Sequence, residues 1–371
     1  MTQGSQTGEG PADFQRCLAL VSTGNYEDEL VFATLTALVS YYVPRAEMRR
    51  AHELVDSLSA RITRDRPWSY PAIESSLGSV TWLEGDFTAA REHLQRALAD
   101  RSAADPRVLE TAWWVAVDPI SAANNFLALT HMVRGDLDRA KAELAESVRR
   151  CDGLGFPQNA HNRAHTYFME IWVCLEAGQI EEASTLVALL RQLSEQSGLD
   201  LWQWVGRTQH ATVKGLAALA AGADAAALAA RAENLMRRVD GSRFIHLNSY
   251  LTFNDAIIGR LLIAAGQPEK ARERLEMSLR HAEETGMRFH DAELMRLVAH
   301  TFTDVQERRN ALAKALKFAR HQGAALFELR CLLDFFDLVG DVDRFALADA
   351  VGRFGGDARW PEFARAQAIL L

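Results

Sequence analysis

The stretch AAGQPEKARERLEMSLRHAEETG, residues 264–286, contains the pattern that decides the fold. A glycine, Gly266, follows an apolar segment, and a segment rich in Glu and Arg then runs to a second glycine, Gly286. Small and aliphatic residues follow the first glycine at Ala271 and Leu275, which places both on one stripe of a helix. Because glycine takes the left-handed backbone conformation at helix ends, the stretch predicts two helices joined by a tight turn.

The same layout recurs along the chain. The turn glycines are Gly85, Gly135, Gly178, Gly222 and Gly266. The alanines at the first stripe position are Ala90, Ala140, Ala183 and Ala271. The aliphatic residues at the second are Leu94, Leu144, Val187 and Leu275. A period of about 43 to 50 residues is typical of helical repeats. We therefore predict an all-α fold, an α-solenoid of tetratricopeptide-like helix–turn–helix repeats in a right-handed superhelix.

Small residues in the first helix of each unit support this fold. They stand at the same distance before the turn, at Gly78, Ala128, Gly215 and Gly259, whereas the third unit has Ile171 there. Such residues predict a close approach of the two helix backbones. Acidic residues directly after the turns, such as Asp86 and Asp136, complement the dipole of the second helix.

The domain organisation follows from where the repeats begin. Residues 1–12 are rich in Gly, Ser, Thr and Gln, which predicts a disordered tail. Residues 13–66 predict an N-terminal helical cap or degenerate repeat, with two helices broken at Pro44. Residues 67–371 form the repeat array, in which we count about seven units.

Composition excludes several classes of function. The chain of 371 residues has 41 Lys and Arg against 49 Asp and Glu, a formal net charge of -8, which disfavours direct nucleic-acid binding. No segment reaches the uninterrupted apolar run of about 18 residues that a membrane helix needs. The 4 cysteines stand far apart without a CxxC pair, so we expect a reducing, cytoplasmic location.

Catalytic and metal-binding motifs are weak. His161 and His165 share a helix face near Glu170, but the HExxH pattern of zinc sites is missing. Other histidines are scattered among acids, at His281, His290, His300 and His321. An acid–base enzyme remains open because such sites are defined by geometry rather than sequence order. We predict no catalytic residue, metal or cofactor.

The first helices of tetratricopeptide repeats line the concave surface, and one stripe of them predicts a binding groove here. The predicted groove residues combine aromatic rings, amides and both signs of charge. They are Trp82, Asn125, His165, Phe168, Trp172, Gln209, Phe253, Arg260, Glu293, His300, Arg330 and Asp334. Such a mixture suits a small ligand or a peptide. The alternatives are a hydrated inner surface and, for the tryptophans, packing between repeats.

From about Asp118 to the C-terminus, the sequence resembles a known family. The strings that carry the resemblance are LEAGQIEEA at 175–183, residues 264–286, AELMRL at 292–297, ARHQGAALFELR at 319–330, and GRFGGDARWPEFARAQAILL at 352–371. They are similar to the repeat regions of MalT-like or LuxR-type regulators and of adenylate cyclases fused to such repeats. The similarity covers about two-thirds of the chain, and its AELMRL and ARHQGAALFELR strings are the most specific.

The resemblance implies the sensing and docking part of such a regulator. The GxxxxGK[ST] phosphate loop of the family's ATPase module is absent from the sequence. On this interpretation the chain is either a stand-alone protein or an excised fragment of a larger regulator, and the initiating Met1 mildly favours the former.

Repeats, missing catalytic motifs and the resemblance together predict a non-catalytic regulatory binding protein in bacterial signalling or transcriptional control. Its partner would be a protein or peptide held on the concave surface. The alternative is a small-molecule receptor whose ligand lies among Trp82, Phe168 and Trp172, since the resemblance implies that this region senses inducers.

Overall fold

The computed structural model describes residues 16, 19–20, 37–61, 70–99, 117–244, 247–340, 343–354 and 359–371. Its regular elements in these ranges are all helices. They are α3 Met48–Arg61, α4 Tyr70–Glu84, α5 Phe87–Ala99, α7 Pro119–Val133, α8 Leu137–Asp152, α9 Gln158–Glu176, α10 Ile180–Gln196, α11 Asp200–Ala220, α12 Ala225–Phe244, α13 Leu251–Ala264, α14 Pro268–Thr285, α15 Asp291–Ala299, α16 Val305–Gln322, α17 Ala325–Val339, α18 Arg344–Gly352 and α19 Pro361–Leu370. Within the described ranges, no helix is both long and apolar enough to cross a membrane.

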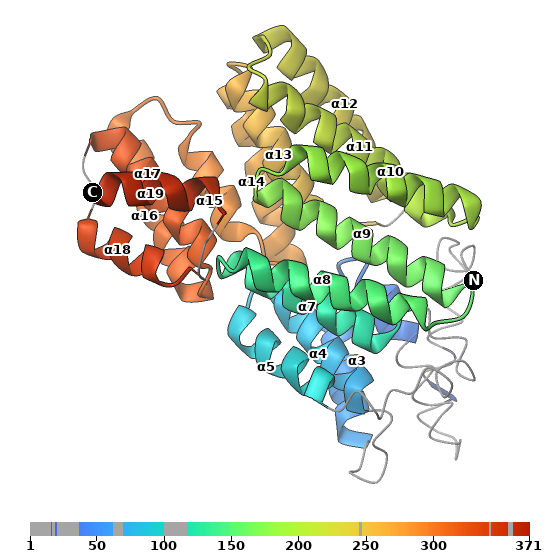
Figure 1. The fold of residues 1–371 in the computed structure, drawn as a ribbon. Coiled ribbons are helices and arrows are strands. Elements are labelled where there is room, and N and C mark those ends of the chain that lie inside the picture. The colour runs from blue at the N-terminus through green and yellow to red at the C-terminus, as the bar shows by residue number, and fades with distance from the viewer. Residues whose placement is uncertain are drawn as a thin grey trace.

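Consecutive helices pack as pairs, from α4 with α5 to α17 with α18, and the pairs stack into a curved array (Figure 1). This arrangement confirms the predicted all-α solenoid. The predicted tail, residues 1–12, lies outside the described residues. In the predicted cap, a turn at residues 43–46 that contains Pro44 separates a helical segment ending at Tyr42 from α3.

The turn glycines have the backbone conformation that the pattern predicts. Gly135 has φ +82° and Gly266 has φ +70°. The Asp136 side chain then accepts a hydrogen bond from the backbone N–H of Arg139 at 3.1 Å, which caps α8. The second helix of this unit ends differently from residues 264–286: α8 ends at Asp152 and its C-cap Gly153 has φ -87°, whereas Gly286 has φ +79°.

Two first-helix glycines permit the predicted close approach within a unit. A Cβ atom added at Gly78 would lie 2.6 Å from the side chain of Leu94, and one at Gly259 would lie 2.7 Å from that of Leu275. In both units the neighbour is the aliphatic residue of the second stripe position. A side chain at either glycine would therefore push the paired helices apart.

The superhelix stacks its last units on the turns of its first ones. The backbone N–H of Phe289 donates to the carbonyl of Leu83 at 3.1 Å. Trp360 Nε1 donates to the carbonyl of Gly135 at 2.9 Å across a separation of 225 residues. In Figure 1 the orange and red helices α15 to α19 accordingly lie against one end of α7, α8 and α9.

The turns on which the late units stack contain helix carbonyl groups that need hydrogen-bond donors. The last carbonyls of a helix have no partner within the helix and must find donors elsewhere. The side-chain amide of Gln322 donates to the carbonyl of Gly85 at 3.4 Å. The guanidinium group of Arg330 donates to the carbonyl of Glu176 at 3.0 Å. Side chains of late units thus satisfy carbonyls at the ends of early first helices.

This stacking buries whole helices. Every residue of α7 is buried, from Pro119 to Val133. A helix that is apolar on most sides is stable only when it is surrounded, and α7 contacts α4, α5, α8, α9 and α17. The inner side of the early units is therefore packed against other parts of the chain.

Candidate functional site

The inner side of the solenoid has an aromatic part, which we call the inner aromatic cluster. Its members come from α4, α7, α9, α13 and the segments before α13 and α15. They are Trp82, Phe126, Phe168, Trp172, Tyr250, Phe253 and Phe289. The cluster contains four of the predicted groove residues.

The two tryptophans of the cluster are buried rather than exposed along an open groove. Trp82 is 0% exposed and Trp172 is 1% exposed. The Trp82 ring stacks on Phe289 with centroids 5.0 Å apart, and the Trp172 ring lies 4.5 Å from that of Phe253. Phe289 belongs to the segment that bonds to Leu83, so closure of the superhelix brings the ring onto Trp82.

A histidine pair extends the cluster along α9. His161 Nδ1 accepts a hydrogen bond from Trp202 Nε1 at 3.2 Å, and the His165 ring lies 5.6 Å from the Trp202 ring. Burial lowers the pKa of His161 to about 4 and, with His161 beside it, that of His165 to about 3. Both rings are therefore neutral near pH 7. Among the residues that the structure describes, no cluster of His, Cys, Asp and Glu is suited to a metal ion.

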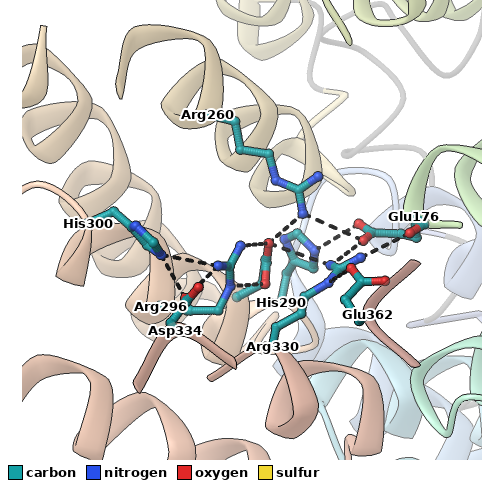
Figure 2. Close-up of polar contacts among 9 residues, drawn as sticks. Glu176, Arg260, His290, Arg296, His300, Arg330, Asp334 and Glu362 are labelled. Atoms are coloured by element: carbon teal, nitrogen blue, oxygen red, sulfur yellow. Dashed lines mark hydrogen bonds and ion pairs between the residues drawn. The ribbon is translucent and has the colours of Figure 1, made fainter. Parts of the chain in front are cut away.

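The charged part of the inner side is a set of ion pairs that we call the inner ionic network (Figure 2). It joins side chains of α9, α13, α15, α17 and α19 with His290 and His300, which flank α15. It brings together five predicted groove residues, Arg260, Glu293, His300, Arg330 and Asp334. Its other members lie outside the predicted groove residues: Glu176, His290, Arg296 and Glu362.

Glu293 is the centre of the network and is 0% exposed. Arg296, one turn later on α15, grips both carboxylate oxygens at 2.8 Å. Arg260 of α13 reaches one of these oxygens at 2.5 Å. Burial alone would raise the pKa of Glu293, but the guanidinium groups of Arg296, Arg330 and Arg260 hold it well below its ordinary value.

Arg330 connects the network to the early units. It donates to the Glu176 carboxylate at 2.6 Å and to the Glu362 carboxylate at 2.7 Å. Burial raises the pKa of Glu176, but this effect is outweighed by Arg330, by His290 and by Arg260, so its pKa is lowered. Three helices, α9, α17 and α19, are therefore fixed to one guanidinium group.

The other end of the network is a His–Asp pair. Asp334 accepts from Arg296 at 2.7 Å, and His300 Nε2 lies 2.7 Å from the same carboxylate. Arg308 lies 2.9 Å from His300 Nδ1 and can only donate there. Nδ1 of His300 therefore faces the guanidinium group of Arg308, and Nε2 faces the Asp334 carboxylate.

Several buried polar side-chain atoms on the first helices lack a hydrogen-bond partner in the described part of the chain. Both amide atoms of Asn124 and of Asn125 on α7 are in this state, as is Oε1 of Gln209 on α11. The indole nitrogens of Trp82 and Trp172 share it. Each unpaired buried group costs about 1–3 kcal/mol of stability. These atoms are therefore costly unpaired groups in the buried interior of the described residues.

Comparison with known proteins identifies the fold. The sequence matches no protein-family model, and no curated protein matches it. Among solved structures, the chain is similar to a Rap protein complexed with Competence and Sporulation Factor, with a TM-score of 0.58 and 11% sequence identity. The similarity covers 100% of this chain and 93% of the Rap chain. At this identity the likeness concerns the fold, a tetratricopeptide-like helical repeat.

Proposed function

We propose that this protein is a non-catalytic regulatory binding protein that recognises a peptide or protein partner on the inner side of its solenoid. The predicted groove residues are the proposed contacts. The observation that carries the proposal is the set of buried, unpaired amide atoms of Asn124, Asn125 and Gln209. Stability alone would favour apolar side chains at these positions, whereas a partner that needs hydrogen bonds there explains why polar ones remain.

A peptide suits these unpaired amides better than an apolar ligand does. A carboxamide offers a donor and an acceptor together, as the peptide backbone does, so the two pair in a two-bond geometry. The indole N–H groups of Trp82 and Trp172 add donors for peptide carbonyls. The packed rings of the inner aromatic cluster supply apolar surface beside these groups.

The fold and the family resemblance support a regulatory role. A protein of the same fold has been solved in complex with a factor, the Competence and Sporulation Factor. The strings at 292–297 and 319–330, which resemble MalT-like regulators, supply Glu293, Arg296 and Arg330 of the inner ionic network. We therefore place the proposed partner in bacterial signalling or transcriptional control. A small-molecule inducer bound near Trp82, Phe168 and Trp172 is the second outcome of the test below.

The test combines ligand screening with the variant Asn125→Leu, which replaces an unpaired amide by an apolar side chain of similar size. Thermal unfolding is recorded with pools of short peptides and of small metabolites. A ligand at 100 times its Kd stabilises the native state by about 2.7 kcal/mol. We expect a peptide to raise the Tm of the wild type. In Asn125→Leu we expect a higher Tm without ligand, by removal of a penalty of about 1–3 kcal/mol, and loss of the ligand shift.

Asn254→Leu is the matched control. The Asn254 amide is also buried, but it donates to the Tyr250 carbonyl at 3.3 Å, so this substitution should lower the Tm. A Tm shift with small metabolites alone would replace the peptide proposal by the receptor alternative. A ligand shift that Asn125→Leu leaves intact would remove α7 from the proposed contact surface.

A further inference from the structure

The last described segment of the chain, residues 359–371, lies on the turn that follows α7. Trp360 is 1% exposed, and its Nε1 donates to the carbonyl of Gly135 at 2.9 Å. Next to it, Arg359 pairs with Asp138 at the start of α8 at 2.6 Å. The Phe354 ring from the end of α18 covers Gly135 so closely that an added Cβ would lie 2.6 Å from it.

The same segment also covers the turn that follows α9. Pro361 lies 3.5 Å from where a Cβ of Gly178 would be. Glu362 accepts from Arg330 Nε at 2.7 Å, while the other nitrogens of Arg330 bind Glu176. An aromatic N–H donor and, two residues later, a carboxylate therefore anchor the segment to two turns far away in the sequence.

The helix that begins at these anchors buries few of its side chains completely. Within α19, Pro361–Leu370, only Ala366 is buried. A helix of this length is marginal in water by itself, and terminal elements with few buried groups open locally at a small fraction of the global free energy. Release of the Trp360 and Glu362 contacts would therefore let the segment detach without unfolding of the remaining units.

From these contacts we propose that the turns after α7 and α9, with Arg330, form a binding site for a peptide segment, which the chain's own residues 359–371 occupy here. The ligand is a segment with a tryptophan and an acidic residue two positions later. This inference deepens the proposed function, since a partner with such a segment would displace the C-terminal residues and bind Arg330. Arg330 belongs to the inner ionic network, so displacement of residues 359–371 would change the contacts of a predicted groove residue directly.

The chemistry of the site selects this class of ligand. The carbonyl of Gly135 ends a buried turn and needs an N–H donor, which the indole ring supplies. Arg330 carries a permanent positive charge and binds carboxylates with directed N–H groups. The glycine at position 178 leaves room for the proline of the segment to contact the backbone, whereas Gly135 is covered by Phe354, which precedes the segment. A neutral or basic segment would not replace the Glu362 carboxylate that binds Arg330 here.

The test uses the full-length chain and a fluorescent peptide with the sequence of residues 359–371. In the wild type, the attached segment competes at a high effective concentration and keeps the free peptide out. The variant Trp360→Ala with Glu362→Gln weakens the attached copy only. We expect this variant to bind the peptide at least about tenfold more tightly than the wild type does. A peptide with alanine at the tryptophan position should not bind.

Hydrogen exchange supplies a second readout that requires no ligand. The Gly135 amide donates to the Met132 carbonyl and the Gly178 amide donates to the Leu175 carbonyl, and both turns lie under the segment. Both amides should exchange faster in the variant. Phe345→Ala is the control, because this side chain on α18 is 89% exposed and its loss should change neither readout.

If the double variant is folded by circular dichroism and binds no peptide, the proposed site is wrong. If it fails to fold, the single variant Glu362→Gln, which keeps the tryptophan anchor, decides by the same two readouts. Peptide binding in these variants, together with no ligand-induced Tm shift of the wild type in the screen, would retain this site and reject the inner-side function. The reverse pattern would retain that function and reject this site.

Discussion

At the scale of single residues, the turn glycines fall into two groups that the sequence pattern does not distinguish. Gly135 and Gly222 have similar left-handed backbones, with φ +82° and +67°. A Cβ at Gly135 would collide with the Phe354 ring, whereas one at Gly222 would meet nothing within 4 Å. The first glycine is needed for backbone conformation and for contact between units, and the second for conformation alone.

Alanine substitution separates these two requirements. Gly222→Ala should cost about 1–2 kcal/mol, the strain of a left-handed residue with a side chain. Gly135→Ala should cost about 1–3 kcal/mol more, because Phe354 must also move. Urea unfolding of the two variants measures both values. Equal losses of unfolding free energy in the two variants would mean that Phe354 moves away from position 135 at little cost.

At the scale of helices, α15 and α17 show what repeat logic can predict. The stripe of first-helix positions identified Glu293, His300, Arg330 and Asp334, and the structure joins all four in one network. Their pairing partners were not predictable. Glu176 lies off the stripe at the end of α9, and only the superhelical pitch brings Arg330 to it across 154 residues.

The superhelical pitch determines most of the contacts between distant units that the sequence does not predict. Periodicity states which face of a helix is inward, because that depends on 3.6 residues per turn. Which distant unit lies against a given helix depends on the small rotation between successive repeats, which adds up along the array. For this reason the stripe predicted Trp82 and Trp172 as inner residues, while their burial under Phe289 emerged only from the structure.

The inner ionic network also gives α15 an acid-sensitive anchor. Because the folded pKa of Glu293 is depressed, its contribution is complete above the ordinary Glu pKa of about 4.3 and is lost as pH falls below it. Glu293→Gln removes the negative charge that Arg296 and Arg260 contact. We therefore expect the free energy of unfolding to fall by about 3–5 kcal/mol at pH 7 and to change less with pH in the acid range. Urea unfolding from pH 7 to pH 3 tests both expectations.

The exposed pair of Lys141 and Glu182 is the control for this prediction. Glu182→Gln should cost less than about 1 kcal/mol, as exposed ion pairs do. A similarly small effect at Glu293 would show that hydrophobic packing alone positions α15.

At the scale of the whole molecule, the stacked turns change how the array should unfold. Repeat arrays with contacts between neighbours only lose their units one after another. Here α15 to α19 also bind the ends of α4, α7 and α9, so the first and last units support each other. We expect the wild type to unfold in one transition with an m-value appropriate to the full chain.

Gln322→Leu tests this coupling. It removes the side-chain donor that the Gly85 and Arg288 carbonyls share. The transition should broaden or divide, and its apparent m-value should fall. Gln306→Leu on the same helix is the control, because its exposed amide donates only to Asn310. An unchanged transition in Gln322→Leu would show that neighbour contacts alone account for cooperativity.

The stacking of late units on early turns also limits how this gene can evolve. Repeat genes often gain or lose a copy by unequal recombination, and an open array tolerates the change because each copy meets only its neighbours. Here an added copy between α9 and α15 would shift every later unit by one position. Trp360 would then face a different turn from Gly135, and Arg330 would lose Glu176. Copy number should therefore be held constant in descendants of this gene, even where the surface residues diverge.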